Sequence, residues 1–265
     1  MRRKFLILFS LTLAITSIAQ INTEAVDNFI ERFSRLNEWS QEKTRSILSK
    51  AEYQPSIIEK MNRPAEGMPW YRYRRIFMTD ERIAAGVDFY NEYKVTIDRV
   101  SEATGVSRGA IMGILGVETY YGQRKGSYQV LDALYTLAFG YPKRARFFTR
   151  ELEEFLLLVE EEKLEIDEMM GSYAGAIGYC QFMPSSYRAY AKSFEDGGNR
   201  DLVNSPEDAI ASIANYLKVH RWKKSEGVTS AIIASPDAVS PGSSKMKPQK
   251  TLAYYEEKGF MPVED

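Results

Sequence analysis

Apolar side chains recur at helical spacing through most of this sequence, and that pattern restricts the possible fold more than any other feature. Residues three, four and seven positions apart share one face of an α-helix, whereas strands need alternation. The clearest runs are Val26, Phe29, Ile30 and Phe33; Ile83, Val87 and Tyr90; Leu152, Phe155, Leu156 and Val159; and Ile210, Ile213, Ala214 and Leu217. Apolar residues make up 44% of the 265 positions, which is enough for a sizeable core. We therefore predict a mainly α fold.

Start and stop signals refine this prediction. Ser107 is expected to cap a helix that runs to about Tyr120. Ser205 is followed by a proline and two acids, which is a typical helix start. Glu151 to Leu164 is expected to be a helix with acids in its first turn. Residues 128–136 fit either a short strand or an irregular loop.

Composition excludes several kinds of site. The chain has one cysteine, Cys180, and one histidine, His220. These single residues exclude an internal disulfide, a multi-cysteine zinc site and a clustered-histidine metal site. The 35 basic and 36 acidic residues argue against a broadly basic nucleic-acid binder. Hydrolytic or lyase chemistry would therefore depend mainly on carboxylates, with Cys180 packing as a small apolar residue and His220 closing a helix.

The first 19 residues have the layout of a secretory signal peptide. Arg2, Arg3 and Lys4 form a positive start, Phe5 to Ile15 is mostly apolar, and small residues flank Ile18. The apolar run is short for a membrane span, although an uncleaved N-terminal anchor is the alternative. We expect an exported, periplasmic or cell-envelope protein whose mature chain has no transmembrane helix.

Glu118 occupies an unusual place for an acid. It follows Ile111 by seven residues, Ile114 by four and Leu115 by three, so it falls on the apolar face of the expected helix. It also lies near the helix C-terminus, where the helix dipole disfavours negative charge. Burial and the dipole both raise the pKa of a carboxyl group, as a general acid requires. The alternative is a helix-end glutamate that reaches water.

A segment rich in small residues follows later in the chain. Gly171, Ala174, Gly175, Ala176 and Gly178 remove side chains over a short stretch, so a ligand or another backbone can come close. Tight packing is the alternative for these residues alone. Gln181, which follows, offers a donor and an acceptor together.

Two long motifs carry a resemblance to a known family. Gly116-Val-Glu-Thr-Tyr-Tyr-Gly122 is followed by Ala174-Gly-Ala-Ile-Gly-Tyr-Cys-Gln-Phe-Met-Pro-Ser-Ser186. In this order they closely resemble the family B (MltB/SltB-type) lytic murein transglycosylases, glycoside hydrolase family 103. Collinear matches run from about Gln54 to Gly259.

The resemblance implies a mainly α (α+β) fold, with a lysozyme-like catalytic core and an additional helical domain. It divides the chain into residues 1–19, a signal peptide; 20–100, an N-terminal helical domain; 101–225, the core with an irregular insertion; and 226–265, a linker and C-terminal helical segment.

The resemblance also implies the reaction and its residues. The substrate would be the MurNAc–GlcNAc β-1,4 bond of peptidoglycan glycan strands, leaving 1,6-anhydro-MurNAc ends. Glu118 matches the single catalytic acid/base, with Tyr120 and Tyr121 as aromatic surface beside it. The implied substrate-binding residues are Tyr73, Lys143, Arg144, Ser172, Gln181, Phe182 and Tyr216, of which Lys143 and Arg144 would face lactyl or stem-peptide carboxylates.

Two departures from the family leave alternatives open. Many relatives carry a calcium loop that needs oxygen ligands at its positions one, three and five. The matching residues here are Ser193, Glu195 and Gly197, of which two are poor or absent ligands. We therefore expect no cofactor and no metal, or weak calcium binding through Glu195, Asp196 and Asp201. Family members also continue beyond the segment that ends near Gly259. The alternatives are therefore a peptidoglycan-binding protein with little catalysis and a hydrolytic muramidase.

Overall fold

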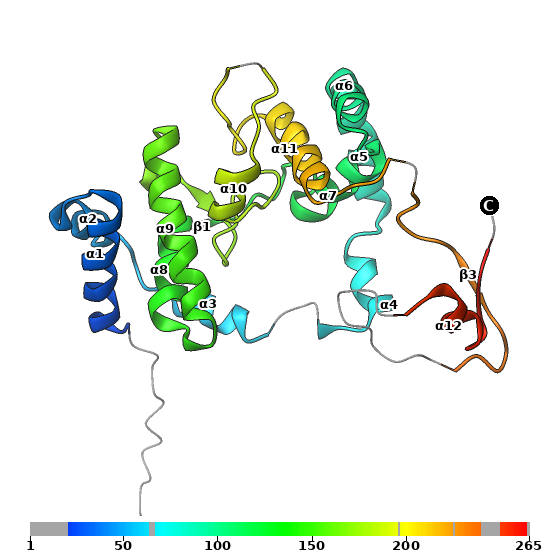
Figure 1. Cartoon of the computed structure of the whole chain (residues 1–265), viewed down its shortest axis with the longest axis horizontal. Coiled ribbons are helices and arrows are strands. Elements are labelled where there is room, and N and C mark those ends of the chain that lie inside the picture. Colours follow the sequence, from blue (N-terminus) through cyan, green and yellow to red (C-terminus); the bar gives the residue numbers. More distant parts are fainter. Residues whose placement is uncertain (1–20, 64–66, 196, 225, 240–249, 264–265) are drawn as a thin grey trace, which may run out of the picture. The chain divides into compact units, whose positions relative to one another are not determined.

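The computed structural model describes residues 21–63, 67–195, 197–224, 226–239 and 250–263 (Figure 1). The expected signal peptide lies outside these residues. The chain divides into two compact units, Met1–Trp222 and Lys223–Asp265. Within the described part, no helix combines the length and hydropathy that crossing a membrane requires. The expected domain boundaries stay predictions.

The first unit is built around a buried helix, α8 (Val130–Gly140). All its residues except Tyr135 are buried, so it is hydrophobic all round, as a central helix must be. Its antiparallel neighbour α9 (Ala145–Glu162) follows after the short helix η3 (Pro142–Arg144) and packs along it. Phe148, Leu152, Phe155 and Leu156 of α9 are fully buried.

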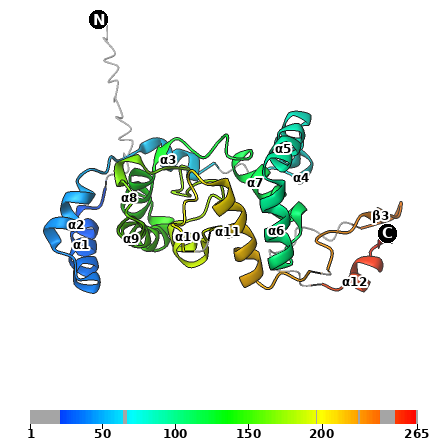
Figure 2. The same cartoon turned by 90° about the horizontal axis from the view of Figure 1, so that it is seen from above.

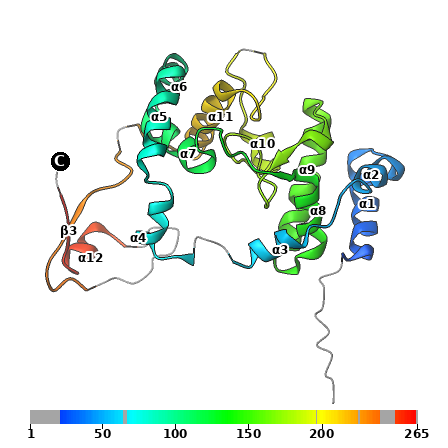
Figure 3. The ribbon, with the colours of Figure 1, turned by 180° about the vertical axis from the view of Figure 1, so that it is seen from behind.

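Three N-terminal helices cover this pair: α1 (Thr23–Asn37), α2 (Gln41–Leu48) and α3 (Pro55–Met61). α1 and α3 contact α8, and the three views show α1 and α2 beside α9 (Figures 1, 2 and 3). Asp132 of α8 accepts the Glu52 backbone N–H at 2.8 Å, and Thr136 accepts that of Gln54 at 2.9 Å. These bonds fix the segment before α3 to the central helix.

A second group of helices carries the glutamate motif. After α4 (Trp70–Tyr73) and η2 (Arg74–Ile76) come α5 (Asp80–Glu92), α6 (Lys94–Thr104) and α7 (Arg108–Thr119). The expected Ser107 cap is confirmed, because its hydroxyl accepts the Ala110 N–H at 3.2 Å. α6 and α7 pack against α11 (Pro206–Val219), whose Ser205 cap is also confirmed (Figure 2).

A small irregular β region joins the two groups. β1 (Tyr128–Gln129) pairs antiparallel with β2 (Met170–Gly171), which follows η4 (Ile166–Glu168). Ile177 bridges to both Gly171 and Phe182, so the small-residue segment folds back on itself. It leads into α10 (Pro184–Tyr190), which packs against α9. Of residues 128–136, only two form a strand, and the rest belong to α8.

The second unit contains an antiparallel pair, β3 (Ile232–Ala234) with β4 (Phe260–Pro262), and the short helix α12 (Leu252–Glu256). Ile232 faces Pro262 across this pair. The strands were not expected from the sequence. Residues 240–249 of the expected linker lie outside the described residues.

The mainly helical prediction is confirmed, with two corrections. The helix expected from Glu151 starts six residues earlier, at Ala145, and has no acid in its first turn. α5 buries Gly86 and Phe89, whereas Ile83 and Val87 are 53% and 55% exposed. Helical spacing identified both helices, but it did not give the start of one or the buried face of the other.

Candidate active site

Glu118 opens into a pocket of about 270 Å³ between α7, α10 and α11. Ile114, one turn before Glu118, lies in the same wall. The other lining residues come from the turn before α10, from α10 and from α11: Cys180, Gln181, Phe182, Met183, Ser186, Ile213 and Tyr216. Of the residues that the structure describes, Glu118 is the sole carboxylate that lines this pocket. The pocket therefore places one acid among neutral and largely apolar side chains.

The pKa of Glu118 is raised, and its cause is desolvation by the pocket walls. The side chain keeps solvent-accessible surface, so a ligand can reach it. The ionised form is disfavoured because those walls replace water that would solvate it. The increase in the pKa of Glu118 that the sequence predicts is therefore present, and desolvation causes it.

This shift has a consequence for stability. A glutamate whose pKa is higher in the folded than in the unfolded state binds more protons when folded. Stability therefore falls as pH rises from the unfolded value through the folded one. We expect Glu118→Gln to be more stable than the wild type at pH 8 and to lose that advantage by pH 4. Thermal unfolding at both values measures this difference, and an advantage that grows toward acid would contradict the assignment.

The backbone of Gln181 is left-handed, with φ of 49°, so the chain turns at this residue. Its amide nitrogen donates to the carbonyl oxygens of Lys125 and Gly178, each at 3.0 Å. Both amide protons are thereby used, so the side-chain oxygen is left to accept a hydrogen bond from a ligand. The sequence suggested a donor and an acceptor, and the structure leaves the acceptor.

Phe182 and Tyr216 form one aromatic wall. Their ring centroids are 5.5 Å apart, and Tyr216 also stacks on His220 at 4.1 Å and meets Tyr190 edge-on at 5.1 Å. His220 caps the end of α11 and contacts the Tyr216 carbonyl oxygen at 2.7 Å through Nδ1. The histidine therefore supports the wall from outside the lining residues.

Cys180 lies beneath Glu118 as a buried thiol. It is 4% exposed and donates to the Ala209 carbonyl oxygen at 3.4 Å. Burial, and secondarily the charge of Glu118, raises the pKa of Cys180. The thiol stays protonated and acts as a small packing residue, as expected from the sequence.

The small residues allow backbones to approach each other. Gly178 has φ of 69°, and a Cβ atom there would lie 2.1 Å from the Leu202 carbonyl oxygen. Ser172 holds the same segment from inside, because its hydroxyl oxygen accepts the N–H groups of Ala174 and Ala176 at 3.2 and 3.1 Å. The tight-packing alternative therefore explains Gly178. Ser172 lies next to the pocket-forming segment but does not line the pocket.

Tyr120 and Tyr121 do not form the expected surface beside the acid. Both have a left-handed backbone, which turns them away from the axis of α7. The Tyr121 ring fills the space left by Gly86 and Gly116, while Tyr120 lies between the guanidinium groups of Arg82 and Arg124. Neither lines the Glu118 pocket.

The other predicted binding residues lie elsewhere. Tyr73 ends α4 and meets Phe77 edge-on at 5.1 Å. Lys143 and Arg144 lie in η3, where Lys143 donates to the Asn62 side-chain oxygen at 3.2 Å, and they line a different pocket. The structure thus brings Glu118, Gln181, Phe182 and Tyr216 together and places Tyr73, Lys143, Arg144 and Ser172 outside that pocket.

Glu151 supports the pocket and was missed as a functional residue. It is 3% exposed, and its carboxylate accepts the Ser185 N–H at 3.0 Å and the Ser185 hydroxyl at 2.7 Å. These bonds fix the start of α10 between the lining residues Met183 and Ser186. The available signal was the same as for Glu118: an acid three residues after Phe148 and four before Phe155, on the buried face of its helix.

The segment that matches the calcium loop is closed by a protein carboxylate. Asp208 accepts the backbone N–H groups of Phe194 and Asp201, both at 2.8 Å. Asp201 in turn accepts the N–H groups of Val203 and Asn204, both at 2.9 Å. Asp196 lies outside the described residues, and the described ones contain no cluster of three metal-binding side chains. Asp201 and Asp208 are thus occupied by backbone N–H groups, and the expected lack of calcium binding stays a prediction.

We accordingly expect no calcium affinity in the micromolar range. Isothermal titration of the chelator-treated protein should give no saturable heat, and thermal unfolding should occur at the same temperature with calcium and with chelator. A calcium-dependent rise in unfolding temperature would contradict this expectation.

Comparison with known proteins shows the family to which the chain belongs. A family model described as a transglycosylase SLT domain matches residues 22–265. Membrane-bound lytic murein transglycosylase B of Escherichia coli K12 is 39% identical over 227 residues, covering 82% of this chain and 62% of that protein.

Two solved structures are similar over most of the chain. Soluble lytic transglycosylase SltB1 of Pseudomonas aeruginosa is 38% identical, with a TM-score of 0.83 and coverage of 91% of this chain and 82% of the other. Escherichia coli Slt35, solved in complex with calcium, is 36% identical, with a TM-score of 0.82 and coverage of 94% and 78%. The lysozyme-like, mainly helical fold is confirmed, and the chain belongs to the transglycosylase SLT domain family, among the relatives of the family B lytic murein transglycosylases.

Proposed function

We propose that this chain is an exported lytic murein transglycosylase. It would cleave the MurNAc–GlcNAc β-1,4 bond of peptidoglycan without water and leave a 1,6-anhydro-MurNAc end. The main support is the Glu118 pocket, where the described lining residues include one carboxyl group of raised pKa and no second carboxylate. Hydrolytic glycosidases of both stereochemical classes ordinarily use two carboxyl groups, whereas intramolecular ring closure needs one.

One residue can carry both proton transfers. Protonated Glu118 donates its proton to the leaving glycosidic oxygen, and the substrate's own N-acetyl group stabilises the sugar cation. Ionised Glu118 then accepts the proton of the 6-hydroxyl as that oxygen bonds to the anomeric carbon. The tethered hydroxyl has an entropic advantage over water. Each turnover returns Glu118 to its protonated form.

The remaining residues have binding roles in this proposal. Phe182 and Tyr216 offer an aromatic wall for sugar rings, and the side-chain oxygen of Gln181 accepts an N–H or O–H from the glycan. Ser172 orients the N-acetyl group with its hydroxyl proton, and Tyr73 extends the groove. Lys143 and Arg144 contact lactyl or peptide carboxylates. The N-terminal sequence supports export to the cell envelope, and the Escherichia coli relative is named as a membrane-bound protein.

Mass spectrometry of the products from purified peptidoglycan tests the proposal. Anhydro-muropeptides, one water lighter than reducing ones, are the expected products. Reducing products would instead identify a muramidase. Retention on the glycan without products would identify a binding protein.

A further inference from the structure

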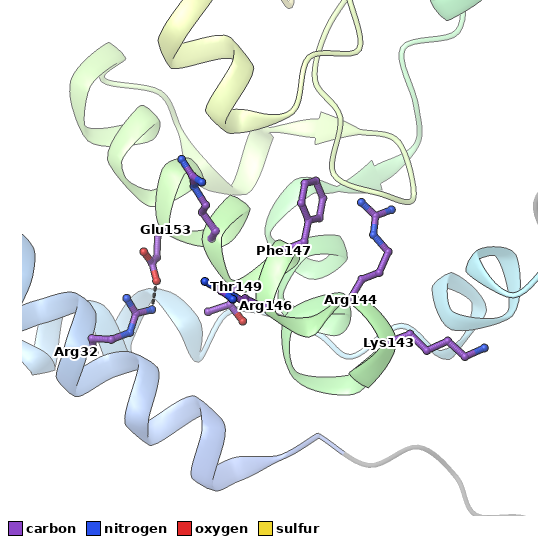
Figure 4. A pocket seen from close by; sticks show the side chains of 8 residues that line it. Arg32, Lys143, Arg144, Arg146, Phe147, Thr149 and Glu153 are labelled. Carbon is purple, nitrogen blue, oxygen red and sulfur yellow. Dashed lines mark hydrogen bonds and ion pairs between the residues drawn. The ribbon is translucent and has the colours of Figure 1, made fainter. Parts of the chain in front are cut away.

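A strongly basic recess in the first unit is separate from the Glu118 pocket. It encloses about 810 Å³ between α1 and the first half of α9 (Figure 4). It is lined by five basic residues, Arg32, Lys143, Arg144, Arg146 and Arg150, with one acid, Glu153, and with Phe147 and Thr149. The whole chain has a net charge of −1, so this concentration of positive charge is local.

Most of this charge is not neutralised by the protein. Glu153 is paired with Arg32 across the two helices, as Figure 4 shows. Among the described residues, the Arg146 and Arg150 guanidinium groups have no hydrogen-bonding or ion-pair partner, and both are exposed. They lie one turn apart, so they face the same side of α9. Two adjacent guanidinium groups thus remain available to an anion.

Their position works against the stability of the helix. The N-terminus of a helix is the positive end of its dipole and favours acids. α9 instead has Arg144 at its N-cap position and Arg146 in its first turn, where it has no acid. Residues that break a local rule without a compensating contact point to a role in function.

The recess has the features of a carboxylate-binding site for a short chain. Guanidinium groups bind carboxylates through two parallel hydrogen bonds. Phe147 is 38% exposed and stacks under Arg144 at 4.3 Å, so it adds an apolar surface for small alkyl side chains. Because the charges line a recess rather than a protruding face, they suit an extended acidic peptide better than a flat lipid surface.

We propose that Arg146 and Arg150, with Arg32 beside them, bind carboxylates of a stem peptide carried by the glycan strand. This inference rests on the proposed function. Lys143 and Arg144 form one end of the same recess, so it continues from the residues expected to meet the peptide nearest the sugar. The protein would then prefer peptide-bearing glycan over glycan whose peptides have been removed.

The test compares binding to these two glycans. Both measurements use a Glu118→Gln background, so that cleavage does not alter the ligand. An exposed guanidinium–carboxylate pair is worth roughly threefold in affinity, so Arg146 and Arg150 together should make the parent bind peptide-bearing glycan at least about tenfold more tightly. Adding Arg146→Gln and Arg150→Gln should lower the ratio of the two affinities by about tenfold, and any preference that remains would come from Arg32, Lys143 and Arg144. The matched control, Arg35→Gln with Arg221→Gln, removes equal charge from exposed positions outside the recess and should keep the ratio.

Several results would overturn the inference. The inference fails if the parent binds the two glycans equally, or if the recess variant keeps the parent's ratio of affinities. It also fails if the control variant loses as much of that ratio as the recess variant. A recess variant that loses binding to phosphatidylglycerol vesicles while keeping its peptide preference would identify a lipid site instead. Titration with the isolated stem peptide separates this inference from the proposed function: if the protein binds no glycan, peptide binding that depends on Arg146 and Arg150 still supports the site.

Discussion

Replacing Glu118 with glutamine is expected to lower the rate of anhydro-muropeptide release by about a thousandfold while leaving the fold intact. Glutamine has nearly the same shape but can neither donate a proton to the leaving oxygen nor take one from the 6-hydroxyl. No other carboxylate in the described part of the chain lines the pocket, so none of the described neighbours can replace it. The loss should appear in the turnover number, because the glycan-binding surface is unchanged.

The measurement is the initial rate of product release from purified peptidoglycan, with circular dichroism to verify the fold. Glu160→Gln is a suitable control, since it alters a surface acid that lines neither the Glu118 pocket nor the basic recess. Substantial turnover by purified Glu118→Gln protein would refute the assignment of Glu118. It would leave the peptide preference of the basic recess open to its own test.

Replacing Glu151 with alanine is expected to lower the free energy of unfolding by about 3 kcal/mol. The variant leaves the Ser185 N–H and hydroxyl without their charged acceptor at a site where Glu151 is 3% exposed, and each such bond is worth about 1.5–3 kcal/mol. For a chain of this size the unfolding temperature should fall by roughly 10 °C. Because Ser185 lies in the first turn of α10, next to the lining residue Ser186, affinity for glycan should also weaken.

Thermal and denaturant unfolding measure this effect. Glu151→Gln retains one acceptor and should lose about half as much stability. Glu160→Ala on the same helix removes a surface pair with Lys43 and should change stability by less than about 1 kcal/mol. Equal losses in Glu151→Ala and Glu160→Ala would contradict the buried role of Glu151.

The sequence predicted the helical class and the main site residue because both depend on local spacing. Glu118 was identifiable as an acid at an apolar position, and Gln181 as part of a long motif. The packing of Tyr121 could not be predicted, because its ring fills space left by Gly86, which lies 35 residues earlier in the chain. β3 was missed for a related reason: all its residues are exposed, so it has no alternating pattern, and its partner β4 follows a long intervening segment.

The start of α9 shows a different limit. Arg146 and Phe147 precede the first acid of the expected helix, and basic residues there contradict the usual dipole preference. Placing the start at Glu151 followed that preference and also hid the buried carboxylate. Packing of Phe148 and Leu152 against α8 outweighs the unfavourable charge, which only the tertiary structure reveals.

The buried position of α8 sets an order for events during synthesis. α1 and α3 emerge first, yet their packing partner begins only at Val130, so these helices lack an apolar surface to dock on until that segment has been made. Isolated helices of 7 to 15 residues are marginal in water, so the early chain should remain sensitive to protease. In the finished protein, the amide protons of α8 should be among the last to exchange with solvent, which would identify it as the most persistent part of the fold.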